Sequence, residues 1–109
     1  MPTYVLLSAL TPRGRETLHA NPERVYAVNE EVERFGCKVI KQYALLGSFD
    51  FLTVLEAPDN ETVAHLSIDL GSRGTLSITT VPAIEIEALE LQLESPHQLD
   101  SRPVTGQER

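Results

Sequence analysis

Residues 43–56, YALLGSFDFLTVLE, carry the strongest signal for the fold of this chain. Two runs of β-forming residues flank Gly47-Ser48 within this stretch. A glycine at the first position of a two-residue loop suits a type II′ hairpin turn, in which its φ angle is positive. We therefore predict a hairpin with strands over 37–46 and 50–56. The register that follows pairs Leu46 with Phe49, Leu45 with Asp50 and Ala44 with Phe51.

The segment before the first helix contains one strand and one break. Residues 3–10, TYVLLSAL, are apolar and β-forming without a helical period, which is typical of a central strand buried on both faces. Pro12 and Gly14 interrupt this run, so residues 11–15 are expected to form a loop. Residues 16–20 are ambiguous, with a single helical turn as one option.

Two amphipathic helices are predicted from their start signals and apolar spacing. The first begins at Asn21-Pro22, an N-cap followed by proline at the first helical position, and ends at Gly36 as a left-handed cap. The second starts with Asp59 or Asn60 as N-cap and is closed by Gly74. Their apolar stripes are Val25, Val28, Val32 and Phe35 in the first helix, and Val63, Leu66 and Leu70 in the second.

The C-terminal part holds a strand, an uncertain segment and a tail. Residues 75–81 are rich in β-branched residues and predict a strand that Pro82 limits in length. Residues 83–93 fit a helix or a strand, and their abundance of Glu, Ala and Leu favours a short helix. Residues 95–109 carry Pro, Gln, Ser, Gly and charge, so we expect a flexible tail that folding does not need, following a domain over 1–94.

This order, β-α-β-β-α-β, predicts an α+β fold, the ferredoxin-like βαββαβ plait with an antiparallel sheet. Right-handed crossovers place the first and third strands in the middle and both helices on one face. The other face would expose apolar side chains as a large patch, and the same face of a second subunit is its simplest cover, giving a dimeric α/β barrel. The side assigned to the helices holds Ile40, Ala44, Leu46, Phe49, Phe51 and Leu55; the other holds Val39, Lys41, Tyr43, Leu45, Asp50, Leu52, Val54 and Glu56.

Composition excludes several classes of partner. The net charge of −7 disfavours nucleic acid and anionic membranes, since phosphate binding needs a basic face. No apolar run approaches the ~20 residues of a membrane span. The first residues lack the basic start of a signal peptide, and the single cysteine, Cys37, precludes an internal disulfide. A cytoplasmic location is the default expectation.

Topology gathers polar groups at the sheet edge where the first strand ends and the first helix begins. Thr11 should lie near Asp50, because the first and third strands are neighbours, and the positive end of a helix dipole adds to basic side chains there. This predicts a site for a small, possibly anionic ligand. Alternatively, Asp50 accepts backbone N–H bonds or pairs with an arginine, and Tyr43 packs at a subunit interface. The candidate binding residues are Thr11, Arg13, Arg24, Tyr43, Gly47 and Asp50.

Other chemistry finds little support in the residues. The histidines at 19, 65 and 97 are scattered without metal-ligand spacing, so no metal site is predicted. Cys37 has Lys38 as its one basic neighbour, which favours an inert thiol. Ser48 lacks the Gly-x-Ser-x-Gly context of a nucleophile. No catalytic residue and no particular cofactor is indicated.

The chain resembles the GYD domain family over roughly residues 3–90. The element that names the family is represented by Gly47-Ser48-Phe49-Asp50, with Phe49 in place of the usual aromatic alcohol. The resemblance implies a dimeric α/β-barrel fold and a function that is not established. Its further motifs are Tyr4, Thr11, Gly14, Asn21-Pro22-Glu23-Arg24, Gly36, Tyr43, Glu56-Ala57-Pro58-Asp59, Gly74, Thr80 and Ala83.

Three classes of function remain open. We favour a non-enzymatic, oligomeric module that binds a small ligand or acts as a sensor, with itself as partner. The alternatives are a dimeric-barrel enzyme, cofactor-free or haem-dependent, with a site around Asp50, and a purely structural oligomer. An enzyme should show a polar cavity with a base of raised pKa, whereas a scaffold should have a filled barrel.

Overall fold

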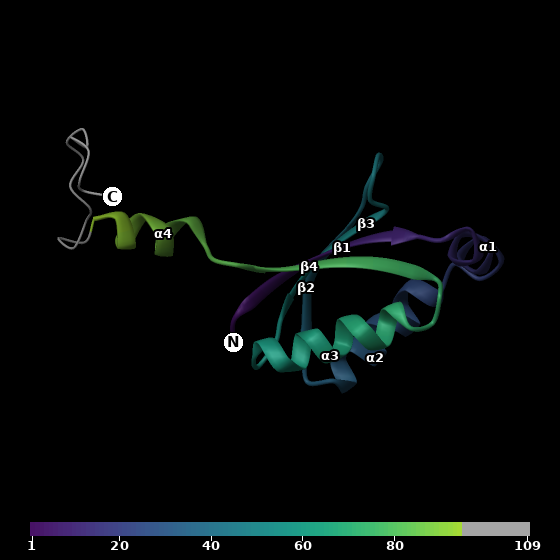
Figure 1. Cartoon of the computed structure of the whole chain (residues 1–109), viewed down its shortest axis with the longest axis horizontal. Helices are drawn as coiled ribbons and strands as arrows, with labels where there is room; N and C mark the ends of the chain where they lie inside the picture. Colours follow the sequence, from purple (N-terminus) through teal and green to yellow (C-terminus); the bar gives the residue numbers. More distant parts are fainter. Residues whose placement is uncertain (95–109) are drawn as a thin grey trace, which may run out of the picture.

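One antiparallel sheet with the strand order β2-β3-β1-β4 organises the computed structural model, which describes residues 1–94 (Figure 1). Helices α2 and α3 lie together on one face of the sheet, and α1 lies at the end of β1. This is the α+β arrangement that the sequence predicts, with β1 and β3 in the middle. The elements are β1 (Thr3–Leu10), α1 (Pro12–Ala20), α2 (Arg24–Arg34), β2 (Lys38–Ala44), β3 (Phe51–Glu56), α3 (Asn60–Gly71), β4 (Leu76–Ala83) and α4 (Ile86–Leu93).

The core lies between the sheet and the two covering helices. Leu55 on β3 and Leu66 on α3 are the largest side chains that are completely buried. Strand β1 turns alternate residues inward, so Tyr4, Leu6 and Ser8 are buried while their neighbours are partly exposed. The predicted stripe of α3 is confirmed, because all three of its apolar residues are buried. In α2, Val32 is buried and Val28 and Phe35 pack against the core.

Helix α1 differs from the loop expected at residues 11–15. Thr11 is its N-cap, and the Thr11 hydroxyl accepts a hydrogen bond from the Gly14 N–H at 3.0 Å. Pro12 occupies the first helical turn, where its missing N–H has no cost. The proline and the glycine therefore start a helix here instead of breaking the chain. Arg13, Arg15 and His19 lie on this helix and not in a loop.

Helix α2 begins later than predicted. The Asn21 N–H donates to the Thr17 carbonyl, so Asn21 ends α1, and the Arg24 N–H donates to the Asn21 carbonyl across a short turn. Glu23 is the N-cap residue of α2 and makes no side-chain capping hydrogen bond. The second start signal is confirmed, because Asp59 caps α3 through a 2.8 Å hydrogen bond from the Thr62 N–H.

The hairpin has the predicted register, but its turn is longer. Ala44 pairs with Phe51, and the Leu45 N–H donates to the Asp50 carbonyl at 2.8 Å. Gly47 has the predicted positive φ, at 114°, inside an irregular turn over residues 45–50 and not in a two-residue loop. Strand β2 ends before this turn and β3 begins after it, so Leu46 belongs to neither strand; it is fully exposed and does not face the helices.

An irregularity in β2 changes which residues face the helices. The register with β3 shifts between Val39 and Lys41, which leaves Ile40 as an extra residue that is 46% exposed. Val39 packs against the core, although the alternation had assigned it to the other face. Phe51 and Leu55 lie on the helix side as predicted. A regular period of two cannot anticipate a bulge. The predicted sides of Val39 and Ile40 are therefore the reverse of those in the structure.

The C-terminal elements confirm one prediction and correct another. Strand β4 continues through Pro82, which pairs with Tyr4 on β1, because β4 is an edge strand and the missing proline N–H costs no ladder bond there. Residues 86–93 form helix α4, as the composition favoured. The expected tail at 95–109 and His97 lie outside the described residues. Within residues 1–94, no helix combines the length and apolarity needed to cross a membrane.

The face of the sheet opposite α2 and α3, which we call the outer face, carries apolar side chains from three strands. Val5 and Leu7 on β1, Leu52 and Val54 on β3, and Val81 on β4 alternate with the inward residues. All are partly or substantially exposed, with Val81 at 40%. A second subunit as cover for this face stays a prediction.

Candidate functional site

The turn at residues 45–50 is fastened to the end of β1 by Asp50. The Asp50 carboxylate accepts a hydrogen bond from the Leu10 N–H at 2.7 Å, and the Asp50 N–H donates to the Ser8 carbonyl at 2.8 Å. These two bonds hold the turn beside the junction of β1 and α1. Two roles for Asp50 were compatible with the sequence, and the hydrogen bond from the Leu10 N–H matches the structural one. Binding of a ligand by Asp50 stays a prediction.

The structure places the six candidate residues in three separate regions. Gly47 and Asp50 share the turn, and Thr11 follows the residue that Asp50 binds. The Thr11 hydroxyl also donates to the Gly74 carbonyl at 2.8 Å, and the Arg13 guanidinium lies beside Gly74. Thr11, Arg13 and Asp50 therefore lie together at the end of β1, whereas Gly47 lies in the exposed part of the turn.

The other two candidates lie on opposite sides of the sheet. Arg24, at the start of α2, lines a pocket on the helix side. Tyr43 lies on the outer face of β2, where it is 49% exposed and the Lys41 ammonium is 5.8 Å from the centre of its ring. Arg24 and Tyr43 accordingly cannot contact one small ligand within a single chain.

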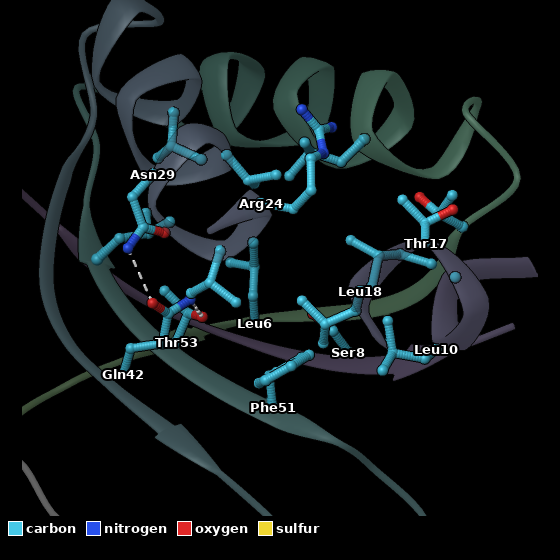
Figure 2. A pocket seen from close by; sticks show the side chains of 18 residues that line it. Leu6, Ser8, Leu10, Thr17, Leu18, Arg24, Asn29, Gln42, Phe51 and Thr53 are labelled. Carbon is cyan, nitrogen blue, oxygen red and sulfur yellow. Dashed lines mark hydrogen bonds between the residues drawn. The ribbon is translucent and has the colours of Figure 1, made fainter. Parts of the chain in front are cut away.

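The pocket that Arg24 lines has a volume of about 110 Å³ and lies between the sheet and helices α1 and α2 (Figure 2). Its apolar wall includes Leu6 and Phe51 from the strands and Leu18 from α1. Such a volume corresponds to a small organic molecule or a few waters. A polar floor distinguishes this pocket from an ordinary gap in a core.

A chain of side-chain hydrogen bonds forms that floor. The Asn29 amide on α2 donates to the Gln42 side-chain oxygen, and the Gln42 amide donates to the Thr53 hydroxyl, both at 2.9 Å (Figure 2). Thr53, in the middle of β3, is 8% exposed, so this polar side chain is buried. The hydrogen bonds offset the cost of burying these polar groups and fix their orientation.

Ser8 adds a hydroxyl to the pocket without a partner. The residue is 7% exposed and lines the pocket from β1, and among residues 1–94 no hydrogen bond to this hydroxyl is found. No fully buried side-chain oxygen lacks a partner in this part of the chain, so the Ser8 oxygen keeps some access to solvent and can bind a ligand or water. Within the described lining, Arg24 supplies a positive charge and no carboxylate contributes. The pocket therefore favours a neutral or anionic ligand.

Sequence reasoning did not identify Ser8, Asn29, Gln42 or Thr53. A signal existed for three of them. Ser8 and Thr53 occupy inward positions of strands whose other inward residues are apolar. Gln42 alternates with Ala44, which the predicted register places on the helix side, and the bulge at Ile40 does not come between them.

The perturbed ionisable groups lie away from the pocket. Burial raises the pKa of the Cys37 thiol, and the negative charge of Asp59 adds to this effect. Hydrogen bonds from Arg73 lower the pKa of the Glu31 carboxyl against an opposing effect of desolvation. Across residues 1–94, no group of three or more His, Cys, Asp or Glu side chains could hold a metal ion.

Two comparisons relate the chain to known proteins. The family model described as the GYD domain matches residues 4–91. A protein of Thermus thermophilus, named glutamine synthetase and cystathionine beta-lyase binding protein, is 48% identical over 95 residues. The alignment covers 86% of this chain and 100% of that protein.

Proposed function

The chain belongs to the GYD domain family, and from this premise we propose that it is a non-enzymatic binding module whose partner is a metabolic enzyme. The relative from Thermus supports this proposal, because its name describes binding to two enzymes and its whole length aligns with this chain at 48% identity. Glutamine synthetase and cystathionine beta-lyase are therefore the first partners to test. The proposal places the protein in the cytoplasm with such enzymes.

The turn at residues 45–50 is the surface that we propose for enzyme binding. Leu46 at its tip has an exposed fraction of 103%, so its side chain contributes nothing to the core. The hydrogen bonds of Asp50 to β1 restrain the turn, which lowers the entropy lost when the leucine enters a pocket on a partner. Restrained apolar side chains of this kind are suited to act as anchors of a protein interface.

Binding to each purified enzyme from the same organism tests the proposal. Biolayer interferometry with immobilised enzyme should give a saturable signal for the full chain, and Leu46→Ser should weaken it by roughly tenfold or more. Ile68→Ser on α3 is the matched control, because Ile68 is also strongly exposed, at 72%, but lies on the helix layer. Absence of binding to both enzymes at micromolar concentration would contradict the enzyme-binding proposal.

Small-ligand binding in the pocket is a second candidate function. The unpartnered hydroxyl of Ser8 supports it, together with the ordered polar floor. The described lining contains no Asp, Glu or His that could serve as a general base, which supports binding without catalysis over the dimeric-barrel enzyme. A ligand here would alter the packing of α2 and give the module a sensory role.

Thermal shift with small organic acids, amides and alcohols tests this second candidate. A compound that binds in the pocket should raise the melting temperature of the wild-type protein. Ser8→Val fills space and removes the hydroxyl, so the shift should disappear, whereas Ser77→Val on exposed β4 should preserve it. A shift that survives in Ser8→Val would place the ligand elsewhere.

A further inference from the structure

Three residues connect the pocket between the sheet and helices α1 and α2 to the turn at residues 45–50. The side chains of Ser8, Leu10 and Phe51 all line this pocket (Figure 2). The Ser8 carbonyl accepts a hydrogen bond from the Asp50 N–H at 2.8 Å, and the Leu10 N–H donates to the Asp50 carboxylate at 2.7 Å. Phe51 follows Asp50 directly as the first residue of β3. Residues that form part of the pocket wall therefore also hold the turn.

The hydrogen-bond chain in the floor of the pocket has a direction, and it leaves hydroxyl groups free to donate. The Gln42 amide donates to the Thr53 hydroxyl oxygen at 2.9 Å, so the hydrogen of this hydroxyl is left for another acceptor. Within residues 1–94, neither this hydroxyl nor that of Ser8 has such an acceptor. Thr53 pairs with Leu6, so Ser8 lies two residues further along β1 on the same face of the sheet. Two hydroxyl groups can thus donate to a ligand in the pocket.

A positive charge without a close counter-ion completes the pocket. Figure 2 shows Arg24 on the helix side of the cavity, whereas Ser8 and Thr53 lie on its sheet side. Arg24 forms no ion pair within residues 1–94; the Glu31 carboxylate, whose pKa its charge helps to lower, binds Arg73 instead. The described lining contains no Asp or Glu. In a small cavity partly shielded from water, an unpaired cation favours an anionic ligand.

The size and the wall of the pocket limit which anion fits. An apolar cavity of about 150 Å³ holds one benzene molecule, so the volume of about 110 Å³ here suits about five or six non-hydrogen atoms. The wall includes the apolar side chains of Leu6, Leu18 and Phe51, which favour an alkyl body. Inorganic phosphate has no apolar part to place against them. A short aliphatic carboxylate such as butyrate combines an alkyl body with oxygens that accept from the hydroxyl groups.

We propose that the pocket binds a short aliphatic carboxylate and that this ligand stabilises the turn that carries Leu46. The proposal rests on small-ligand binding, the second candidate function given above, and adds the class of ligand and its effect. Release of the turn breaks both hydrogen bonds of Asp50 to β1 and loosens Leu10 and Phe51 in the pocket wall. A ligand packed on these side chains binds the closed form better and shifts the population toward it. Occupancy of the pocket thereby controls the order of the enzyme-binding surface.

Isothermal titration of the full chain with three probes of similar size tests the class of ligand. Butyrate should bind, whereas butyramide should bind about fivefold more weakly, because hydrogen bonds to a charged group are roughly twice as strong. Butylamine, a cation, should not bind. Arg24→Gln should weaken the binding of butyrate and leave that of butyramide unchanged. Arg15→Gln on α1 is the charge-matched control, because Arg15 does not line the pocket.

The probes separate failure of the carboxylate from failure of pocket binding. Butyramide that binds as tightly as butyrate would overturn the carboxylate, while small-ligand binding in the pocket would stand. Butyrate affinity that survives Arg24→Gln would also overturn it, because the anion then binds elsewhere. If none of the three binds at millimolar concentration, the carboxylate is overturned, and the broader thermal-shift panel described above decides whether the pocket binds another ligand.

Amide hydrogen exchange followed by NMR tests the effect on the turn without any enzyme. The Leu10 and Leu45 N–H groups both donate to Asp50, so their exchange reports opening of the turn. With butyrate at about ten times its dissociation constant, this exchange should slow about tenfold. The Thr62 N–H, which donates to Asp59 at the start of α3, is the control and should not change. Unchanged exchange of Leu10 and Leu45 at saturating butyrate would overturn the control of the turn.

Discussion

The carboxylate of Asp50 lies 2.7 Å from the backbone nitrogen of Leu10, forty residues earlier in the sequence. This bond fastens the exposed hairpin turn to the end of the central strand. It satisfies a backbone N–H at the point where β1 leaves the sheet and α1 begins. Asp50, a candidate binding residue from the sequence, thus has a defined structural contact.

Substitution of Asp50 should destabilise the protein in the absence of any ligand. Asp50→Ala leaves the Leu10 N–H without its acceptor and should cost about 1–3 kcal/mol of unfolding free energy. Asp50→Asn keeps an acceptor but loses the charge, so its cost should lie near the lower end of this range. Urea denaturation measures both values. Glu16→Gln on α1 is a surface control, and an Asp50→Ala variant as stable as wild type would favour a dedicated ligand-binding role for Asp50.

Gly14 should tolerate no side chain, in contrast to another helical glycine. A Cβ atom at Gly14 would lie 2.1 Å from the carbonyl oxygen of Thr75, the residue before β4, so Gly14→Ala must displace α1 from Thr75 and should cost at least about 1–3 kcal/mol. Gly71, at the end of α3, has nothing within 4 Å of the same position. Gly71→Ala should be neutral or stabilising by up to about 1 kcal/mol. Equal stability of the two variants in thermal and urea unfolding would contradict the close approach.

The ion pair between Glu31 and Arg73 should contribute to stability in a pH-dependent way. Arg73 donates to both carboxylate oxygens of Glu31, at 2.9 and 2.7 Å, and joins α2 to the end of α3. The pKa of Glu31 is lowered in the folded state, so the contribution is present above its ordinary value of 4.5 and is lost as pH falls through the lowered folded value.

Glu31→Gln is the variant that measures this contribution. Both side chains are about one-third exposed, so screening limits the expected loss to about 0.2–1 kcal/mol at pH 7. The difference from wild type should shrink at pH 3 and in high salt. A difference that grows on acidification would show that the carboxylate acts in another way.

Cys37 should react slowly with thiol reagents in the native protein. It is 4% exposed, and burial raises its pKa, so little thiolate forms at pH 8. A disulfide-exchange assay should give a rate at least about tenfold lower in buffer than in urea. Cys37→Ser/Ile40→Cys provides an exposed thiol three residues further along the chain, and it should react fast in both conditions. A native Cys37 that reacts as fast as this control would disprove the inert thiol.

The helices show where local sequence is sufficient and where it is not. Asp59 and the spacing of Val63, Leu66 and Leu70 predicted α3 correctly, because capping and apolar period are properties of adjacent turns. Helix α1 was missed, since Pro12 and Gly14 also occur in loops. What selects the helix is tertiary contact: the Thr75 carbonyl accepts from the Thr11 N–H and leaves room for Gly14 alone.

Three features of the fold follow from the sequence, because turn chemistry and apolar patterning encode them locally. They are the strand order, the hairpin register at Ala44 and Phe51, and the positive φ of Gly47. Which side chains meet depends instead on tertiary packing. A one-residue bulge at Ile40 turned Val39 toward the core, and the approach of α2 brought Asn29 to Gln42, completing a polar floor with Thr53. Such contacts join segments that are distant in sequence, so no local pattern specifies them.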